Sequence, residues 1–139
     1  MKYSLSLKEK TVRGIATLRI SQKNSTLVCR AINKKRFPEA KGFLERLKDK
    51  KTSINGKYFT KTVEEISKFL KQLEDNARAQ NIDPENMFLF ISSYQGPTMR
   101  RGRRRWKKFG TQMKICHVQG ILGEKNGVGK KVRERGNKK

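Results

Sequence analysis

The chain has 139 residues, of which 35 are Lys or Arg and 12 are Asp or Glu, so its formal net charge is +23. This length suits one domain with a modest core, and the charge predicts an anionic partner, either a nucleic acid or a membrane surface, because so large an excess would otherwise repel itself. No apolar run approaches the roughly 20 residues that span a bilayer, and the N-terminus lacks the apolar core of a secretion signal, so we expect an intracellular protein.

The first part of the chain predicts a strand and a helix. Residues 1–14 are polar and basic, and we expect an arm that leads into a strand at about 15–20, where apolar and polar residues alternate. Asn24 or Ser25 is a suitable N-cap for a helix that ends at Asn33. The apolar stripe of this helix consists of Leu27, Val28, Ala31 and Ile32.

A second helix is expected to begin at Pro38, because proline suits the first turn of a helix. Its apolar face consists of Ala40, Phe43, Leu44 and Leu47. Residues 50–59 are predicted to be a polar connection, in which Asn55 and Gly56 are typical of a turn.

The clearest helix is predicted at about residues 61–80. Thr62 and Glu65 fit a capping box, in which each side chain accepts a hydrogen bond from a free backbone N–H group of the first turn. The apolar stripe of this helix consists of Val63, Ile66, Leu70, Leu73 and Ala77. Four acids also lie on it, namely Glu64, Glu65, Glu74 and Asp75. We therefore expect this helix to pack on protein with its apolar face and to lie away from a polyanion.

Two further strands are predicted at 87–94 and 113–122, with a strongly basic segment between them. From Thr98 to Gly110, seven of the thirteen residues are Lys or Arg and none is acidic. The simplest topology is a hairpin whose basic end projects from the sheet. We therefore predict an α+β fold: a small three-stranded antiparallel sheet packed with about three helices, plus a long protruding basic β-hairpin.

No catalytic, cofactor or metal site can be read from the sequence. Cys116 and His117 are neighbours, so on a strand their side chains point to opposite faces and cannot easily share a proton. Together with Cys29 they supply three zinc ligands in no recognised spacing. We interpret the cysteines as small core residues of a protein in a reducing compartment. We expect no enzyme activity, no cofactor and no metal.

The basic segment is either a targeting or solubilising run or a nucleic-acid contact. Trp106 and Phe109 would be exposed in such a run, and this favours the contact, because guanidinium groups suit phosphates and aromatic rings stack on bases. No predicted helix combines a basic face with base-reading residues at its N-terminus, which favours RNA over DNA. A DNA-compacting protein and a nucleic-acid-processing enzyme are the alternatives.

The order of these motifs resembles large-subunit ribosomal protein twenty-two, called seventeen in the older eukaryotic naming. The resemblance covers about residues 3–123 and begins with Tyr3-Ser4-Leu5. Its further motifs are Leu18-Arg19-Ile20, Lys23-Asn24-Ser25, Ala40-Lys41-Gly42-Phe43-Leu44 and Leu73-Glu74-Asp75-Asn76-Ala77. The most specific part is Pro97-Thr98-Met99-Arg100-Arg101, followed by Cys116-His117-Val118. The short connection at 50–59 suggests an archaeal or a compacted eukaryotic member.

The resemblance implies a structural protein of the large ribosomal subunit, in the cytoplasm, and in the nucleolus during assembly if the source is eukaryotic. Residues 1–123 would be one domain with a hairpin extension at about 95–116, and 124–139 a basic tail that is disordered unless it binds RNA. Its partners would be large-subunit rRNA, neighbouring ribosomal proteins and the nascent polypeptide, with no membrane and no DNA. The implied rRNA-binding residues are Arg19, Lys23, Asn24, Arg100, Arg101, Arg103, Arg104, Arg105, Lys107, Lys108 and Lys114. The implied tip of the hairpin, facing the peptide exit tunnel, consists of Trp106, Lys107, Lys108, Phe109 and Gly110.

Overall fold

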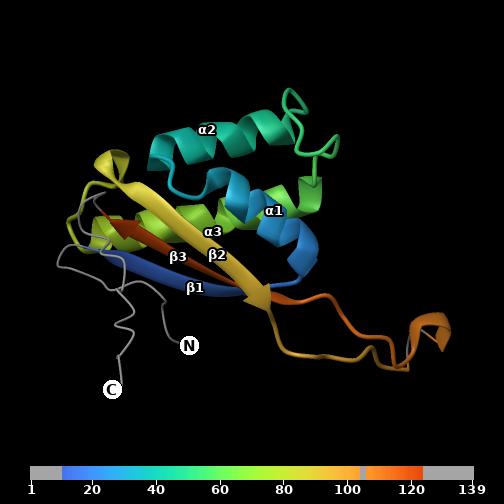
Figure 1. The fold of residues 1–139 in the computed structure, drawn as a ribbon. Coiled ribbons are helices and arrows are strands. Elements are labelled where there is room, and N and C mark those ends of the chain that lie inside the picture. Colours follow the sequence, from blue (N-terminus) through green and yellow to red (C-terminus); the bar gives the residue numbers. More distant parts are fainter. Residues whose placement is uncertain (1–10, 104–105, 124–139) are drawn as a thin grey trace, which may run out of the picture.

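The computed structural model describes residues 11–103 and 106–123. The elements follow in the order β1 (Val12–Leu18), α1 (Gln22–Ile32), α2 (Phe37–Lys48), α3 (Thr60–Ala79), the short 3₁₀ helix η1 (Pro84–Asn86), β2 (Phe88–Gln95), the 3₁₀ helix η2 (Trp106–Lys108) and β3 (Cys116–Gly123). Over these residues the predicted α+β class, with three α-helices beside a three-stranded antiparallel sheet, is confirmed (Figure 1).

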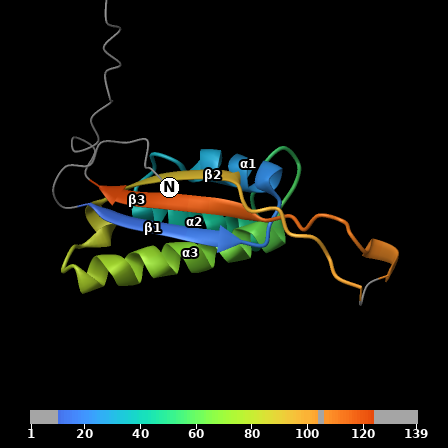
Figure 2. The ribbon, with the colours of Figure 1, turned by 90° about the horizontal axis from the view of Figure 1, so that it is seen from below.

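The last strand of the chain lies in the middle of the sheet, in the order β1–β3–β2 (Figure 2). It pairs antiparallel with β1 from Val12 opposite Leu122 to Leu18 opposite Cys116. It also pairs antiparallel with β2, which puts Gln95 opposite Cys116. The sheet therefore has one end where β1 ends, β2 ends and β3 begins, and the segment between β2 and β3 leaves the sheet there.

The helices cover one face of the sheet (Figures 1 and 2), and α3 packs against β1 and β3. A Cβ atom on Gly120 would lie 2.7 Å from Leu73 Cδ1, and one on Gly14 would lie 2.7 Å from Leu73 Cδ2. Both glycines are therefore required where this helix crosses β1 and β3. Where α1 lies against β2, a hydrogen bond of 3.1 Å joins the hydroxyl oxygens of Thr26 and Ser93.

The predicted start of the first strand and the predicted N-caps of two helices are wrong by three or four residues. The first strand begins at Val12 rather than near residue 15, because its pairing with β3 continues to Leu122. The N-cap of α1 is Ser21 rather than Asn24 or Ser25; the latter is buried, with its Oγ 3.9 Å from Cys29 Sγ.

The N-cap of α3 is Phe59, with a left-handed φ of 48°, and not Thr62. Thr62 is buried inside the helix, so its side chain cannot act as the cap, and Glu65 pairs with Lys68 at 2.9 Å instead of reaching back. The predicted capping box is therefore wrong. The polar connection before α3 turns at Asn55 and Gly56, both of positive φ, as predicted.

Residues 96–115, here called the extension, project from the sheet beyond the ends of β2 and β3 (Figure 1, lower right). Backbone hydrogen bonds join its two arms from Gly96 N to Ile115 O at 3.1 Å, from Met113 N to Met99 O at 2.8 Å and from Arg101 N to Thr111 O at 3.0 Å. The described residues of the extension contain one isolated bridge, between Arg100 and Gln112, and no regular strand. The predicted long β-hairpin is therefore not confirmed as a regular ribbon, in keeping with the marginal stability of two strands without a third. Residues 1–10 and the predicted tail at 124–139 lie outside the described residues.

Candidate nucleic-acid interface

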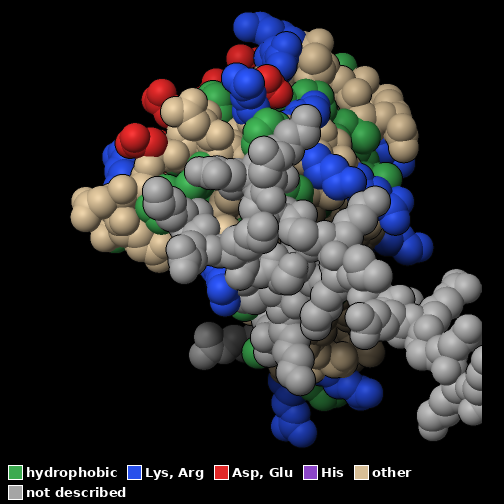
Figure 3. Space-filling model, turned by 60° about the vertical axis from the view of Figure 1, so that its left-hand side comes forward, with side chains coloured by type: hydrophobic (Ala, Val, Ile, Leu, Met, Phe, Trp, Pro, Cys, Tyr) green, Lys and Arg blue, Asp and Glu red, His purple; other side chains and the backbone are tan. Residues whose placement is uncertain are grey.

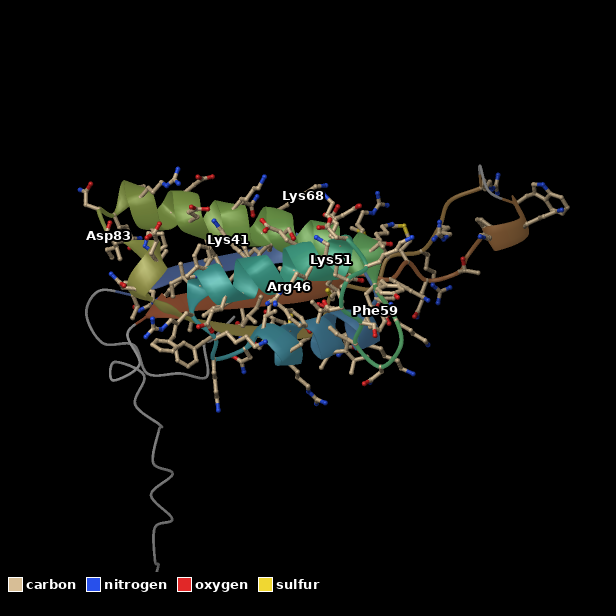
Figure 4. All side chains as sticks on the ribbon, turned by 90° about the horizontal axis from the view of Figure 1, so that it is seen from above. Lys41, Arg46, Lys51, Phe59, Lys68 and Asp83 are labelled. Atoms are coloured by element: carbon tan, nitrogen blue, oxygen red, sulfur yellow. The ribbon has the colours of Figure 1, made fainter. Side chains whose placement is uncertain are left out.

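Acidic side chains are confined to one part of the described structure. All of them lie on α2, α3 and η1 or on the connections next to these helices. In Figure 3 the acidic side chains in view gather in one area, whereas Lys and Arg are spread over the surface. Figure 4 shows Asp83 at the end of the molecule away from the extension, and Phe59 at the end near it. Glu64 and Glu65 lie within seven residues of Phe59 on α3, so the described part of the extension, and not this whole end of the molecule, is free of acids.

The acids neutralise cations within their own layer. Glu74 of α3 accepts hydrogen bonds from Lys41 of α2 and from Arg78, the latter at 3.0 Å. The hydrogen bond from Lys41 is the main cause that lowers the pKa of Glu74, and Arg78 adds to it. Among the described residues, no ion pair involves a cation of the extension. Its positive charge is therefore available to an external anion.

The tip of the extension exposes two aromatic rings among cations. Trp106 is 79% exposed and Phe109 59% exposed, which are the two highest values among the large hydrophobic side chains of the described structure. The short turn of η2 is closed by hydrogen bonds from Thr111 Oγ1 to Lys108 O at 2.7 Å and from Phe109 N to Trp106 O at 3.3 Å. Lys107 Nζ lies 5.4 Å from the centre of the Trp106 ring. Exposed rings beside cations are suited to stacking on unpaired bases.

A hollow at the root of the extension brings together cations that are distant in sequence. Its lining includes Arg19 at the end of β1, Lys61 at the start of α3, and Arg101, Lys108 and Lys114 of the extension. No acidic residue of the described structure lines it. Arg19 also reaches the far arm, since its Nη2 lies 3.2 Å from Met113 Sδ. This hollow is a concave, acid-free site with five positive charges.

The N-termini of two long helices open into the same hollow. Ser21 and Asn24 line it from α1, and Lys61 and Thr62 line it from α3. Neither helix has a hydrogen bond from the side chain of its N-cap residue, and neither has an acid in its first turn. The positive ends of the helix dipoles therefore add to the charge of the side chains, and backbone N–H groups can bind an anion there.

The structure brings five of the predicted rRNA-binding residues into this hollow: Arg19, Asn24, Arg101, Lys108 and Lys114. Four others are exposed outside its lining, namely Lys23 in the first turn of α1, and Arg100, Arg103 and Lys107 on the extension. Arg104 and Arg105 lie outside the described residues. Gly110, in the predicted tip, has a φ of 71°, which suits glycine at this turn.

Sequence reasoning missed Lys61, which it treated as part of an ordinary amphipathic helix. A lysine in the first turn of a helix is opposed by the positive end of the helix dipole. Lys61 stands there with no acid in the same turn. That unfavourable placement was the available signal of an anion partner.

The two cysteines are buried, and the histidine contacts side chains of the neighbouring strands. Cys116 is fully buried, while His117 points to the other face, where its Nδ1 lies 2.8 Å from Thr17 Oγ1 and its ring 5.3 Å from that of Tyr94. Burial raises the pKa of the Cys29 thiol to about 11. Over the described residues, no three metal-ligating side chains are grouped around one point, and no helix is long and apolar enough to cross a membrane.

Comparison with known proteins matches residues 15–122 to the family described as ribosomal protein L22p/L17e. The chain is also similar to the large ribosomal subunit protein uL22 of Methanosphaera stadtmanae, with 30% identity over 132 residues that cover 78% of this chain and 84% of that protein. The matched residues include the whole extension and both body-side cations of the hollow, Arg19 and Lys61.

Proposed function

This chain belongs to the ribosomal protein L22p/L17e family, which supports a structural role in the large ribosomal subunit, and on that premise we propose that it binds and organises large-subunit rRNA near the peptide exit tunnel. The observation that carries the proposal is the acid-free basic surface formed by the extension and the hollow at its root. Phosphate groups would neutralise its cations, and the exposed rings of Trp106 and Phe109 would stack on unpaired bases.

The binding would come mainly from phosphate neutralisation and the release of counterions. The surface supplies nine cations that the structure describes in the hollow, on the extension or in the first turn of α1: Arg19, Lys23, Lys61, Arg100, Arg101, Arg103, Lys107, Lys108 and Lys114. Specificity would follow from the shape of the folded RNA, because the concave hollow and the projecting extension cannot both engage a plain duplex groove.

The test is the salt dependence of binding to deproteinised large-subunit rRNA, with duplex DNA at equal phosphate concentration as the control. Six to ten phosphate contacts would weaken the affinity by about 10³–10⁵ between 50 and 200 mM salt. A shallow salt slope would contradict the proposal. Equal affinity for rRNA and DNA at 150 mM salt would favour a DNA-compacting protein instead.

We further propose that the tip, from Trp106 to Gly110, faces the tunnel and the nascent polypeptide. Deletion of residues 103–109 removes most of the tip, including Lys108 of the hollow, but keeps the other four cations of the hollow: Arg19, Lys61, Arg101 and Lys114. We expect the deleted protein to enter the large subunit and to alter the passage of nascent chains, measured by ribosome profiling. If the deletion instead prevents subunit assembly, the extension serves chiefly as an assembly anchor.

The proposed partners are large-subunit rRNA and neighbouring large-subunit proteins, in the cytoplasm, with assembly in the nucleolus if the source is eukaryotic. Sedimentation of the tagged protein through a sucrose gradient after a high-salt wash tests this placement. We expect it to remain with the large subunit. Release to the top of the gradient would identify a transient factor rather than an integral protein.

A further inference from the structure

We infer that the hollow at the root of the extension seats a phosphate of the RNA backbone, and that this phosphate clamps the extension to the body of the domain. The inference rests on the proposed function and deepens it, since it names the atoms bound and the consequence of binding. Lys61 becomes a binding residue, although the sequence analysis treated it as part of an ordinary amphipathic helix.

The five cations of the hollow come from two parts of the structure, the body of the domain and the extension. Arg19 and Lys61 belong to the body, whereas Arg101, Lys108 and Lys114 belong to the extension. Like charges at close range repel, and the lining offers no acid that would offset the repulsion. In the absence of an anion, these charges therefore favour a larger separation of the extension from the body.

Few contacts oppose that separation. Among the described residues, the side-chain hydrogen bond between the body and the extension runs from Arg19 to the thioether of Met113, and a thioether is a weak acceptor. The root is held by Ile115, which is buried, and by the hydrogen bond from Gly96 N to Ile115 O. The direction of the extension is thus set by Gly96 and Ile115, next to the sheet, and not by a packed interface or an ion pair.

A phosphodiester fits this hollow better than other anions. It carries one negative charge on two oxygens that different cations can share, and guanidinium and helix N-termini are both typical phosphate ligands. The site is lined from both sides and lies beside the exposed cations of the extension, so a strand that places one phosphate in the hollow can place the next ones along the arms. A single bound phosphate would turn repulsion between body and extension into attraction through a shared anion.

The test compares Lys61→Ala with Lys71→Ala. Both lysines are exposed on α3 and both substitutions remove one charge, but Lys71 does not line the hollow. For wild type, Lys61→Ala and Lys71→Ala, the affinity for deproteinised large-subunit rRNA is measured as a function of salt. We expect Lys61→Ala to weaken binding by about tenfold and to reduce the salt slope by about one unit, and Lys71→Ala to change neither.

Clamping of the extension to the body is tested by measuring the distance between two spin labels. One label is attached at Gln72→Cys on α3 and the other at Gly102→Cys on the extension. Both positions are exposed, a Cβ on Gly102 meets open space, and the native cysteines are buried. We expect rRNA to narrow the distribution of distances in the wild-type background and to leave it broad with Lys61→Ala.

The outcomes separate the inference from the proposed function. If wild type does not bind rRNA with a steep salt slope, the proposed function fails. If wild type binds but Lys61→Ala behaves like Lys71→Ala, the function stands and the phosphate seat is refuted. An unchanged distance distribution on binding would overturn the clamp. Narrowing by inorganic phosphate alone, against chloride at equal ionic strength, would overturn RNA as the required occupant.

Discussion

Replacing Gly120 with alanine would test how closely α3 is packed on the sheet. The added Cβ would lie 2.7 Å from Leu73 Cδ1 and 3.0 Å from Phe69 Cε1, both closer than carbon atoms normally approach. Leu73 and Phe69 are both buried, so these side chains or the helix that carries them must shift. Inserting a methyl group into such a core costs about 1–3 kcal/mol.

The assay is urea unfolding followed by circular dichroism, with Gly42→Ala as the matched control. Gly42 lies within α2, and a Cβ there meets nothing within 4 Å. The same chemical change should therefore stabilise at this position by about 0.5–1 kcal/mol, because glycine is a poor helix former. The two substitutions are predicted to shift the free energy of unfolding in opposite directions.

The consequence for function follows from the position of Lys61 at the start of the same helix. If the substitution displaces α3, Lys61 moves relative to Arg19, which directly follows β1, so Gly120→Ala should then also weaken rRNA binding under conditions in which the protein stays folded. An unfolding free energy equal to that of wild type would refute the close packing from which this reasoning starts. Normal stability with weakened binding would refute the link through helix displacement.

Three further predictions concern the root, the tip and the core. Gly96→Ala should destabilise by about 1–3 kcal/mol in urea, because its Cβ would lie 3.0 Å from the backbone of Ile115, whereas Gly102→Ala should be neutral. Trp106→Ala should weaken rRNA binding by about 1–3 kcal/mol in a filter-binding assay without lowering the unfolding midpoint, because the ring is exposed. Because burial raises the pKa of Cys29 to about 11, the unfolded thiol ionises first, so stability should fall as pH rises from about 9 to 11, and Cys29→Ala should flatten this fall in pH-dependent urea unfolding.

The periodicity of apolar residues was sufficient to predict the elements of the fold. The stripe of Val63, Ile66 and Leu73 identified α3, and all three residues are buried. Element starts were less predictable, because local capping preferences compete with packing. Threonine favours the N-cap position, but the side chain of Thr62 is buried in the core and Thr62 lies within the helix. The N-cap residue is Phe59 instead.

The candidate site was predictable only where it is continuous in sequence. The cluster of cations from Arg100 to Lys108 stands out in the chain, and the structure places its described members on the exposed extension. The hollow was not predictable, because Arg19 and Lys61 meet the extension only after β1 pairs with β3 and α3 packs across both. Contacts of this kind depend on topology, which no local pattern contains.

The separation of charge in this molecule explains how a chain with a net charge of +23 can keep a folded core. The acids lie over α2 and α3, where Glu74 pairs with Lys41 and Arg78 and thereby neutralises cations next to the packed helices. No acid lines the hollow, and no described ion pair involves a cation of the extension, while Lys61 lies three and four residues before Glu64 and Glu65 on α3. The extension contributes little to the core beyond Ile115. Repulsion therefore acts on the position of the extension and only weakly on the stability of the domain. An anionic partner would then change the position of the extension and leave the core as it is. Added salt screens the same repulsion, so it should change the distances between body and extension more than the free energy of unfolding.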